Sequence, residues 1–520
     1  MELASIAAAA AAAIPLLGLG AASRRRAVLP RSRLPGLVSP ERALTRLYWS
    51  AWQGAWERLH DPQLTLIPTT GADDGTALAA QDAKYAAGVL PGQRMPMPRQ
   101  TPSAPVWAWA EWDIYLVGGD RARLARVLPV VARFHRWMVE NHRSADGLYH
   151  LDRATPTRVV LSSQMALDAH RLSLMARELE CHDDAAAFAA EHAELTQGIN
   201  RELWAAAGRA YNENGTAETP ALAQAWPLLA GVVPPQRADA VIGHLAEWML
   251  RRSPSGEDMT ATYVVVRALL AAGRPGLART VALEHLRALM TEPGATAPHA
   301  GVIAAIIEAV LGLSADARTG TLRWTPRVSA RHGIQNLRFG DHTVSVRSAA
   351  RAPGRDYVIR TEADRPFTLQ VATDFSQGTA WRGKKSLGPL NAGATAIEVR
   401  AGTAEYRIRG EPGPDGFPPG QPQGLAVVRT AQGARLQWQP CVDDDLAGYC
   451  VYRTEDHGWR NVSGALCAWS SYTDDDPPPG GCRYAVAAVD AASNTSPMSA
   501  PADLGAVGGA PSALTPPESA

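Results

Sequence analysis

Apolar positions recur with the period of an α-helix through residues 40–313. The segment 121–141 shows the pattern well, because Leu124, Val127, Leu128, Val131 and Met138 fall on one face and the arginines of this segment lie largely off it. The same pattern predicts helices at 44–60, 163–181, 185–205, 220–231, 237–251, 259–272, 275–290 and 301–312. Short Gly/Pro breaks separate them, which predicts antiparallel helical hairpins packed side by side.

The pattern changes to short runs of strand-forming residues near Thr319. Runs at 322–324, 343–346, 357–359 and 367–371 are separated by Gly, Pro and Asp, which predicts an antiparallel β-domain ending near Arg409. A Pro/Gly-rich linker follows, and a second β-domain begins at Leu425. The tail after Val507 is rich in Ala, Pro and Ser and is expected to be disordered.

Length and charge exclude several classes of protein. A chain of 520 residues predicts two to four domains. Lys+Arg and Asp+Glu are each 51, so the zero net charge gives no support for binding nucleic acid or anionic lipid. Fifteen Trp against six Phe is a hint of carbohydrate handling, since the indole face stacks on sugar rings, although Trp-rich helical cores give the same count.

The cysteines gather near the C-terminus. Cys181 lies alone in the helical part, whereas Cys441, Cys450, Cys467 and Cys482 fall within one small β-domain. Their spacing is not that of a zinc site, so we expect one or two disulfides and an oxidising compartment; four unpaired thiols are the alternative.

The N-terminal segment agrees in part with export. An Ala/Leu-rich apolar run covers residues 3–22, and small residues at 20–23 suit cleavage. Three arginines follow the run instead of preceding it, so an uncleaved anchor is the alternative to a signal peptide. Either reading predicts a secreted or membrane-anchored, extracytoplasmic protein.

The C-terminal β-domain, 425–503, resembles a fibronectin type III domain. The matching segments are LQW at 436–438, DLAGY at 445–449, VYR at 451–453, SYTD at 471–474, YAV at 484–486 and AVD at 488–490. The resemblance implies a β-sandwich with Trp438 in its core, serving as a spacer or as an accessory for cell-surface or glycan contact, without catalysis.

The helical region resembles the six-hairpin glycosidases, which include trehalase, glucosidase I and mannosylglycerate hydrolase-type enzymes. The matching segments are PVWAWAEWDIY at 105–115, GD at 119–120, FHRW at 134–137, DGLY at 146–149, INRELW at 199–204 and PLLAG at 227–231. The segments WTP at 324–326 and NLRFG at 336–340 resemble the small β-domain that follows such toroids. The resemblance implies an (α/α)6 helical toroid at 40–315 after a leader and linker at 1–39, then an antiparallel β-domain at 316–410, a linker at 411–424 and, beyond the fibronectin-like domain, a tail at 504–520.

Glycoside hydrolysis requires two carboxyl groups, and inversion, which the resemblance implies, separates them by about 6.5–9.5 Å. The segment LDRATP at 151–156 keeps the Asp and a nearby Pro of the family's acid motif, and TEPG at 291–294 matches its base motif. Asp152 is therefore the candidate general acid and Glu292 the candidate base. The alternatives are a helix-capping or loop carboxylate for Asp152 and a solvated residue after a helix for Glu292.

The resemblance also names substrate-binding candidates: Trp107, Trp109 and Glu111, with Tyr263 and His299 as weaker ones. Trp109 continues a helical stripe with Trp112 and Leu116, so a core position is its alternative.

No nucleotide-binding Gly motif, zinc-protease motif or serine-hydrolase elbow is present in the sequence, and we expect no cofactor and no metal. The expected function is inverting hydrolysis of an α-linked glucoside or a related oligosaccharide. The alternative is a catalytically inactive toroid that binds glycans or serves as a structural cell-surface protein.

Overall fold

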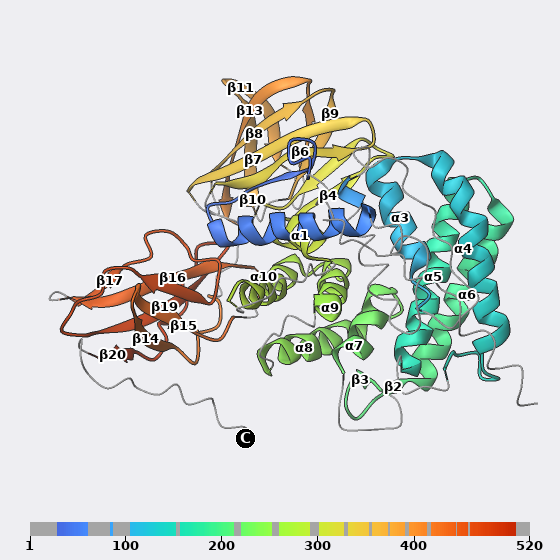
Figure 1. Cartoon of the computed structure of the whole chain (residues 1–520), viewed down its shortest axis with the longest axis horizontal. Helices are drawn as coiled ribbons and strands as arrows, with labels where there is room; N and C mark the ends of the chain where they lie inside the picture. The colour runs from blue at the N-terminus through green and yellow to red at the C-terminus, as the bar shows by residue number, and fades with distance from the viewer. Residues whose placement is uncertain are drawn as a thin grey trace, which may run out of the picture.

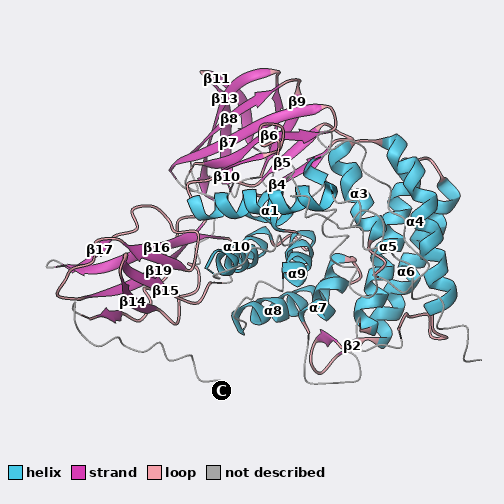
Figure 2. Ribbon diagram, viewed as in Figure 1, coloured by secondary structure: helices cyan, strands magenta, loops and turns pink. Residues whose placement is uncertain are grey.

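The structure is a computed structural model, and three bodies are visible in it: a helical body, a large β-domain and a small β-sandwich (Figure 1). It describes residues 29–60, 84–86, 104–151, 157–212, 220–251, 259–291, 301–326, 331–352, 356–372, 375–390, 395–412, 418–441, 443, 445–455 and 458–505. Helices and strands are segregated between these bodies (Figure 2).

The predicted helices are confirmed, with ends within a few residues of those expected. They are α1 (Arg42–His60), α4 (Arg121–His142), α5 (Arg158–Glu178), α6 (His182–Glu202), α7 (Ala221–Leu229), α8 (Pro235–Arg251), α9 (Met259–Ala271), α10 (Pro275–Thr291) and α11 (Val302–Ala305), and the structure adds α3 (Trp107–Gly118). α11 continues as a π-helical segment, η3 (Ile306–Val310), and a single 3₁₀ turn, η1 (Lys84–Ala86), lies beside α3.

The helices form an inner and an outer row. α3, α5, α7, α9 and α11 contact one another in chain order, and α4, α6, α8 and α10 each follow an inner helix. α3 is buried on nearly every side and α5 on most, as inner helices are, whereas α4 carries arginines on an exposed face. Short turns join each inner helix to its outer partner; in the first, Gly119 has a left-handed φ of 69° and Asp120 caps α4 by accepting from the Arg123 amide at 2.8 Å.

The large β-domain packs on the ends of the inner helices. One sheet has the strand order β1-β6-β7-β8-β13-β10-β11 and the other β12-β9-β5-β4. The strands are β1 (Gly36–Val38), β4 (Leu313–Asp316), β5 (Thr321–Trp324), β6 (His332–Phe339), β7 (His342–Ala352), β8 (Asp356–Ala363), β9 (Phe367–Val371), β10 (Phe375–Arg382), β11 (Lys385–Leu390), β12 (Thr395–Val399) and β13 (Gly402–Pro412). Amides of Ala317 and Gly340 donate to the last carbonyls of α3, each at 2.7 Å, so this domain caps the C-terminal end of that helix.

Strand β1 was not predicted from the sequence. It pairs antiparallel with β6, so residues just before α1 belong to the sheet, whereas the pattern suggested a linker there. A three-residue strand carries too little alternation to be seen without its partner.

The small β-sandwich has its own core. Its sheets have the orders β14-β15-β18 and β17-β16-β19-β20, and Trp438 packs edge-on against Tyr449 at 5.2 Å inside it. The strands are β14 (Ala426–Thr430), β15 (Gly433–Gln437), β16 (Leu446–Glu455), β17 (Gly458–Asn461), β18 (Ser471–Asp474), β19 (Cys482–Asp490) and β20 (Ala502–Leu504). A two-strand hairpin, β2 (Trp204–Ala205) with β3 (Ala210–Tyr211), follows α6.

The structure contains none of the expected disulfides, and all five cysteines are free thiols. The strand register gives a reason. Tyr449 lies opposite Cys467 in an antiparallel bridge, so Cys450, the next residue, points to the other face of the sheet. Cys441, Cys467 and Cys482 instead border the core of the sandwich.

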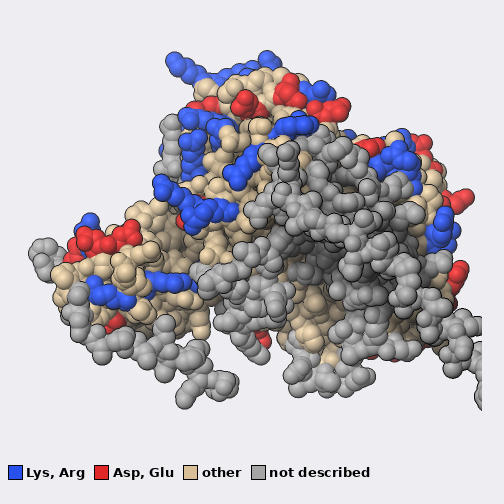
Figure 3. Space-filling view, in the orientation of Figure 1, with Lys and Arg blue, Asp and Glu red and all other residues tan. Residues whose placement is uncertain are grey.

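In the view of Figure 3, Lys and Arg side chains are interspersed with Asp and Glu over the large β-domain, as the zero net charge leads one to expect. Within the described residues, no helix is both long and apolar enough to cross a bilayer.

Candidate functional site

The two predicted catalytic carboxylates, Asp152 and Glu292, lie outside the described residues, as does His299. In chain order, Asp152 falls between α4 and α5, and Glu292 falls between α10 and α11. Each segment therefore leads from an outer helix into an inner helix. Their roles stay predictions.

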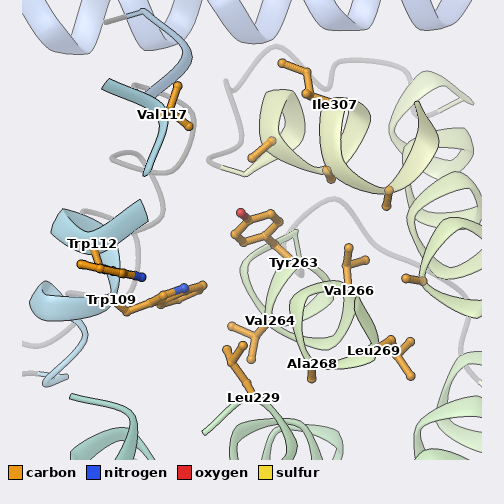
Figure 4. Close-up of a cluster of buried hydrophobic side chains, with 14 of the residues drawn as sticks. Trp109, Trp112, Val117, Leu229, Tyr263, Val264, Val266, Ala268, Leu269 and Ile307 are labelled. Atoms are coloured by element: carbon orange, nitrogen blue, oxygen red, sulfur yellow. The ribbon is translucent and has the colours of Figure 1, made fainter. Parts of the chain in front are cut away.

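Trp109 of α3 and Tyr263 of α9 lie side by side in a cluster of buried hydrophobic side chains (Figure 4). Their rings stack with centroids 6.3 Å apart, and Trp226 packs edge-on against Trp109 at 5.9 Å. Trp109 is 1% exposed and Tyr263 is fully buried, and Trp107 is also buried, at the start of α3. These aromatic side chains form part of the core in this structure, so substrate contact by any of them stays a prediction.

Glu111 is held by a buried arginine. Arg123 donates to both carboxylate oxygens, from Nε at 3.0 Å and from Nη2 at 2.7 Å. Burial raises the pKa of Glu111, although the bonded Arg123 opposes that rise. The pair ties α3 to α4, and any contact between Glu111 and a substrate hydroxyl stays a prediction.

Four charged side chains from different elements converge at the middle of the inner row; we call them the inner charge cluster. Lys84 lies 2.5 Å from Glu308 and 3.7 Å from Asp113. Arg267 Nη1 lies 2.7 Å from Asp113 Oδ2 and 3.3 Å from Glu308 Oε2. The four come from η1, α3, α9 and η3, so the cluster joins segments that are far apart in the chain.

The two carboxylates of the inner charge cluster are both held as anions. Burial alone would raise the pKa of Asp113, but the charges of Arg267, Lys84 and Arg171 lower it to about 2. Lys84 and Arg267 likewise outweigh burial and lower the pKa of Glu308.

Two tyrosines complete the hydrogen bonding of Glu308. The Tyr85 hydroxyl donates to Oε1 at 2.9 Å and the Tyr263 hydroxyl to Oε2 at 3.3 Å. Burial raises the pKa of both phenols, so they remain protonated donors. The inner charge cluster can therefore orient polar groups and bind ions, but neither carboxylate is suited to donate a proton at neutral pH.

A second buried network holds α4, α5 and α6 together. His135 Nδ1 lies 2.8 Å from Asp168 Oδ2, and its Nε2 lies 3.1 Å from Glu191 Oε2. Asp168 also accepts from the amide of Ala108, at 3.2 Å, which fixes the first turn of α3. Burial alone would lower the pKa of His135, but hydrogen bonds to the two carboxylates raise it to about 9, so the imidazole is charged at neutral pH.

Sequence reasoning missed these buried charges, although a signal for them exists. Asp113, Arg267 and Glu308 each stand within a helical segment that is otherwise largely apolar, such as TYVVVRALLA around Arg267. A charge in such a segment must be buried, and a buried charge requires a partner on another element.

Comparisons with known proteins match parts of this chain. Residues 76–288 match the family model described as the bacterial alpha-L-rhamnosidase 6 hairpin glycosidase domain. Asp152 lies within the matched residues and Glu292 lies beyond them. An uncharacterized protein of Borreliella burgdorferi is 33% identical over 48 residues, which are 9% of this chain and 10% of that protein.

Three solved structures share the fold. An alpha-L-rhamnosidase from Dictyoglumus thermophilum has a TM-score of 0.53 at 13% identity, covering 72% of this chain and 50% of its own. The Streptomyces avermitilis alpha-L-rhamnosidase, complexed with L-rhamnose, has a TM-score of 0.52 at 15% identity, with coverage of 72% and 42%. A sialidase has a TM-score of 0.51 at 9% identity, with coverage of 72% and 41%.

At such identities these structures show the fold alone, and this chain spans about half the length of the first of them or less. The family match is to the rhamnosidase domain and not to the trehalase-like type that the motifs suggested. The helical region of this chain is of the six-hairpin glycosidase type.

Proposed function

We propose that this protein is a glycoside hydrolase that removes an α-L-rhamnosyl residue from a glycan. The observation that carries the proposal is the match of residues 76–288 to the rhamnosidase domain. The sequence motifs alone suggested an α-linked glucoside instead. The sialidase has almost the same TM-score as the rhamnosidases, so the fold does not determine which sugar is bound. The test below therefore compares the α-L-rhamnoside with the α-D-glucoside.

We assign the acid role to Asp152 and the base role to Glu292, with inversion at the anomeric carbon. The hairpin topology supports the pair. Asp152 precedes α5 and Glu292 precedes α11 in the chain, and these two inner helices run in the same direction within the inner row. The two helices therefore begin at the same end of the helical body. The inner charge cluster is not an alternative pair, because its carboxylates are ionised and an acid must carry a proton.

The test is hydrolysis of p-nitrophenyl α-L-rhamnoside, with the α-D-glucoside beside it. We expect turnover of the rhamnoside, and a loss of at least 100-fold in kcat for Asp152→Asn and for Glu292→Gln. Asp239→Asn and Glu405→Gln are matched controls, since these two carboxylates form exposed ion pairs with Arg274 and Arg360. Turnover of the glucoside alone would overturn the rhamnoside assignment, and full activity of either variant would overturn the pair.

The second candidate is a glycan-binding protein without turnover. It is favoured because three described carboxylates of the inner row, Asp113, Asp168 and Glu308, each form an ion pair with a buried cation. Binding of rhamnosyl oligosaccharides in calorimetry with no product after prolonged incubation would support it. Product formation that Asp152→Asn removes would exclude it.

We also propose that the small β-sandwich is a fibronectin type III domain serving as an accessory. Its three-strand and four-strand sheets and the core position of Trp438 support this reading. Export remains a proposal that rests on the apolar run at 3–22, because the free thiols remove the argument from disulfides.

A further inference from the structure

A cavity of about 730 Å³ lies between the helical body and the large β-domain. Its helical wall comes from the C-terminal ends of inner helices, at Leu116 and Val117 of α3, Leu229 of α7 and Leu270 of α9. Its other wall comes from the sheet β12-β9-β5-β4, at Ser314, Arg323 and Gln370. This volume is in the range of pockets that hold small organic ligands.

The cavity lies far from the N-terminal end of α5, the helix that follows Asp152 in the chain. Arg171, which lines it, stands 13 residues after Arg158, the first residue of α5. At 1.5 Å per residue, about 20 Å of helix separate the cavity from the end at which the segment containing Asp152 enters α5. The cavity therefore lies toward the end of the helical body opposite to the start of α5.

Positive charge exceeds negative charge among the described residues that line the cavity. The inner charge cluster supplies two cations and two carboxylates, so Asp113 and Glu308 are already neutralised by Lys84 and Arg267. Arg171 and Arg323 add two further cations. No other carboxylate is present among the described lining residues.

Arg171 is the cation with the poorest compensation. Burial lowers the pKa of its guanidinium, with only partial relief from the charge of Asp113. Its Nε is buried and has no hydrogen-bond partner among the described residues. A buried guanidinium whose charge is only partly balanced is unfavourable, and an anion beside the part of Arg171 that lines the cavity would balance that charge.

We propose that this cavity binds a monosaccharide-sized organic anion, with its carboxylate or phosphate group at Arg171 and Arg323. The apolar side chains of α3, α7 and α9 cover one face of the ligand. Gln370, which accepts from Arg323 Nε at 2.9 Å, and Ser314 hydrogen-bond the ligand's hydroxyl groups at the rim. The site is independent of the proposed hydrolase activity and takes a charged ligand in place of a neutral one.

The test is calorimetric titration of the full chain with three probes of similar size: glucuronate, glucose 6-phosphate and neutral glucose. We expect one of the anions to bind, with an affinity that weakens as the salt concentration rises, and glucose not to bind. The preferred anion identifies a carboxylate or a phosphate as the recognised group. Absence of binding by both anions at millimolar concentration, or equal binding of glucose, would overturn the proposal.

Variants test whether the anion binds in the cavity. Arg171→Gln and Arg323→Gln should each weaken binding at least tenfold, and Arg171→Lys, which keeps the charge, should weaken it less than Arg171→Gln. Arg360→Gln is the matched control, since Arg360 lies on β8 in an exposed pair with Glu405, and its affinity should equal that of the parent. Arg323 is exposed, so its substitution leaves folding intact even if Arg171→Gln does not fold. Unchanged affinity in Arg323→Gln would overturn the assignment.

Discussion

The Ser470 hydroxyl donates a 2.8 Å hydrogen bond to Oε1 of Glu284, and this bond joins the small β-sandwich to helix α10. Ser470 is fully buried, and its amide also lies 3.3 Å from the same oxygen. The neighbouring Trp469 is buried in the core cluster of the helical body and not in that of the sandwich. The sandwich is therefore docked on the helical body, and a freely moving spacer is not the arrangement seen (Figure 1).

The first prediction concerns this docking. Trp469→Ala should lower the free energy of unfolding of the helical body by about 3–5 kcal/mol, because it leaves a cavity in that core. Ser470→Ala should cost about 1.5–3 kcal/mol, since it removes a hydrogen bond to a buried carboxylate. Urea unfolding measures both effects. Trp459→Ala is the control, because Trp459 is an exposed tryptophan on β17, and a loss there as large as that of Trp469→Ala would contradict docking through Trp469.

The second prediction concerns the turn between η3 and β4. Gly312 has a left-handed φ of 69°, and a Cβ there would lie 2.5 Å from the backbone oxygen of Thr325. Gly312→Ala should therefore destabilise the junction of helical body and β-domain by more than about 2 kcal/mol, from strain and clash together. Gly383→Ala is the matched control, because Gly383 has a φ of 58° with open space around it. Equal losses in the two variants, measured by urea unfolding, would show that the clash contributes nothing.

The helices and strands could largely be predicted from the sequence, whereas the long-range pairings could not. Helix ends at 60, 251 and 290 were placed within a residue, because period and Gly/Pro breaks are local signals. The pairing of β1 with β6 and the insertion of Trp469 into the helical core depend on partners hundreds of residues away. The predicted catalytic carboxylates stay untested, whereas the inner charge cluster could not be predicted, since Lys84 and Glu308 are more than 200 residues apart in the chain and meet only in the folded protein.

The third prediction concerns pH. The pKa of His135 is raised to about 9 in the folded protein, against an ordinary value near 6.5. A raised pKa gives stability that is complete below pH 6.5 and is lost as the pH rises toward 9. The free energy of unfolding should therefore fall by about 2–3 kcal/mol between pH 6.5 and 8.5.

The buried thiols also lower stability toward pH 8.5, because burial raises their pKa values, so the His135→Gln variant is needed to separate the share of His135. Burial lowers the pKa of His170 to about 4, so this residue changes charge below the pH range of the measurement. Urea unfolding at pH 6.5, 7.5 and 8.5 gives the slope, and His135→Gln should remove most of it while lowering stability at every pH. A parent protein whose stability is constant across this range would contradict a charged His135 between Asp168 and Glu191.

The last prediction concerns the thiols, for which sequence and structure disagree. Cys181 is exposed, whereas burial raises the pKa of Cys441 and of Cys467 to about 12 and also raises those of Cys450 and Cys482. Since the thiolate is the reactive form, a thiol reagent should label Cys181 quickly and the other four slowly in the native protein.

Denaturation without reductant should then expose five reactive thiols per chain, because the structure holds no disulfide among its five cysteines. Cys181→Ser should remove the fast phase and leave a total of four. A total of three or one for the parent would mean that one or two bridges form, as the clustering in 441–482 suggested. Such bridges would require Cys450 to turn toward the core face or Cys441, Cys467 and Cys482 to move together, since the register of β16 points Cys450 away from them.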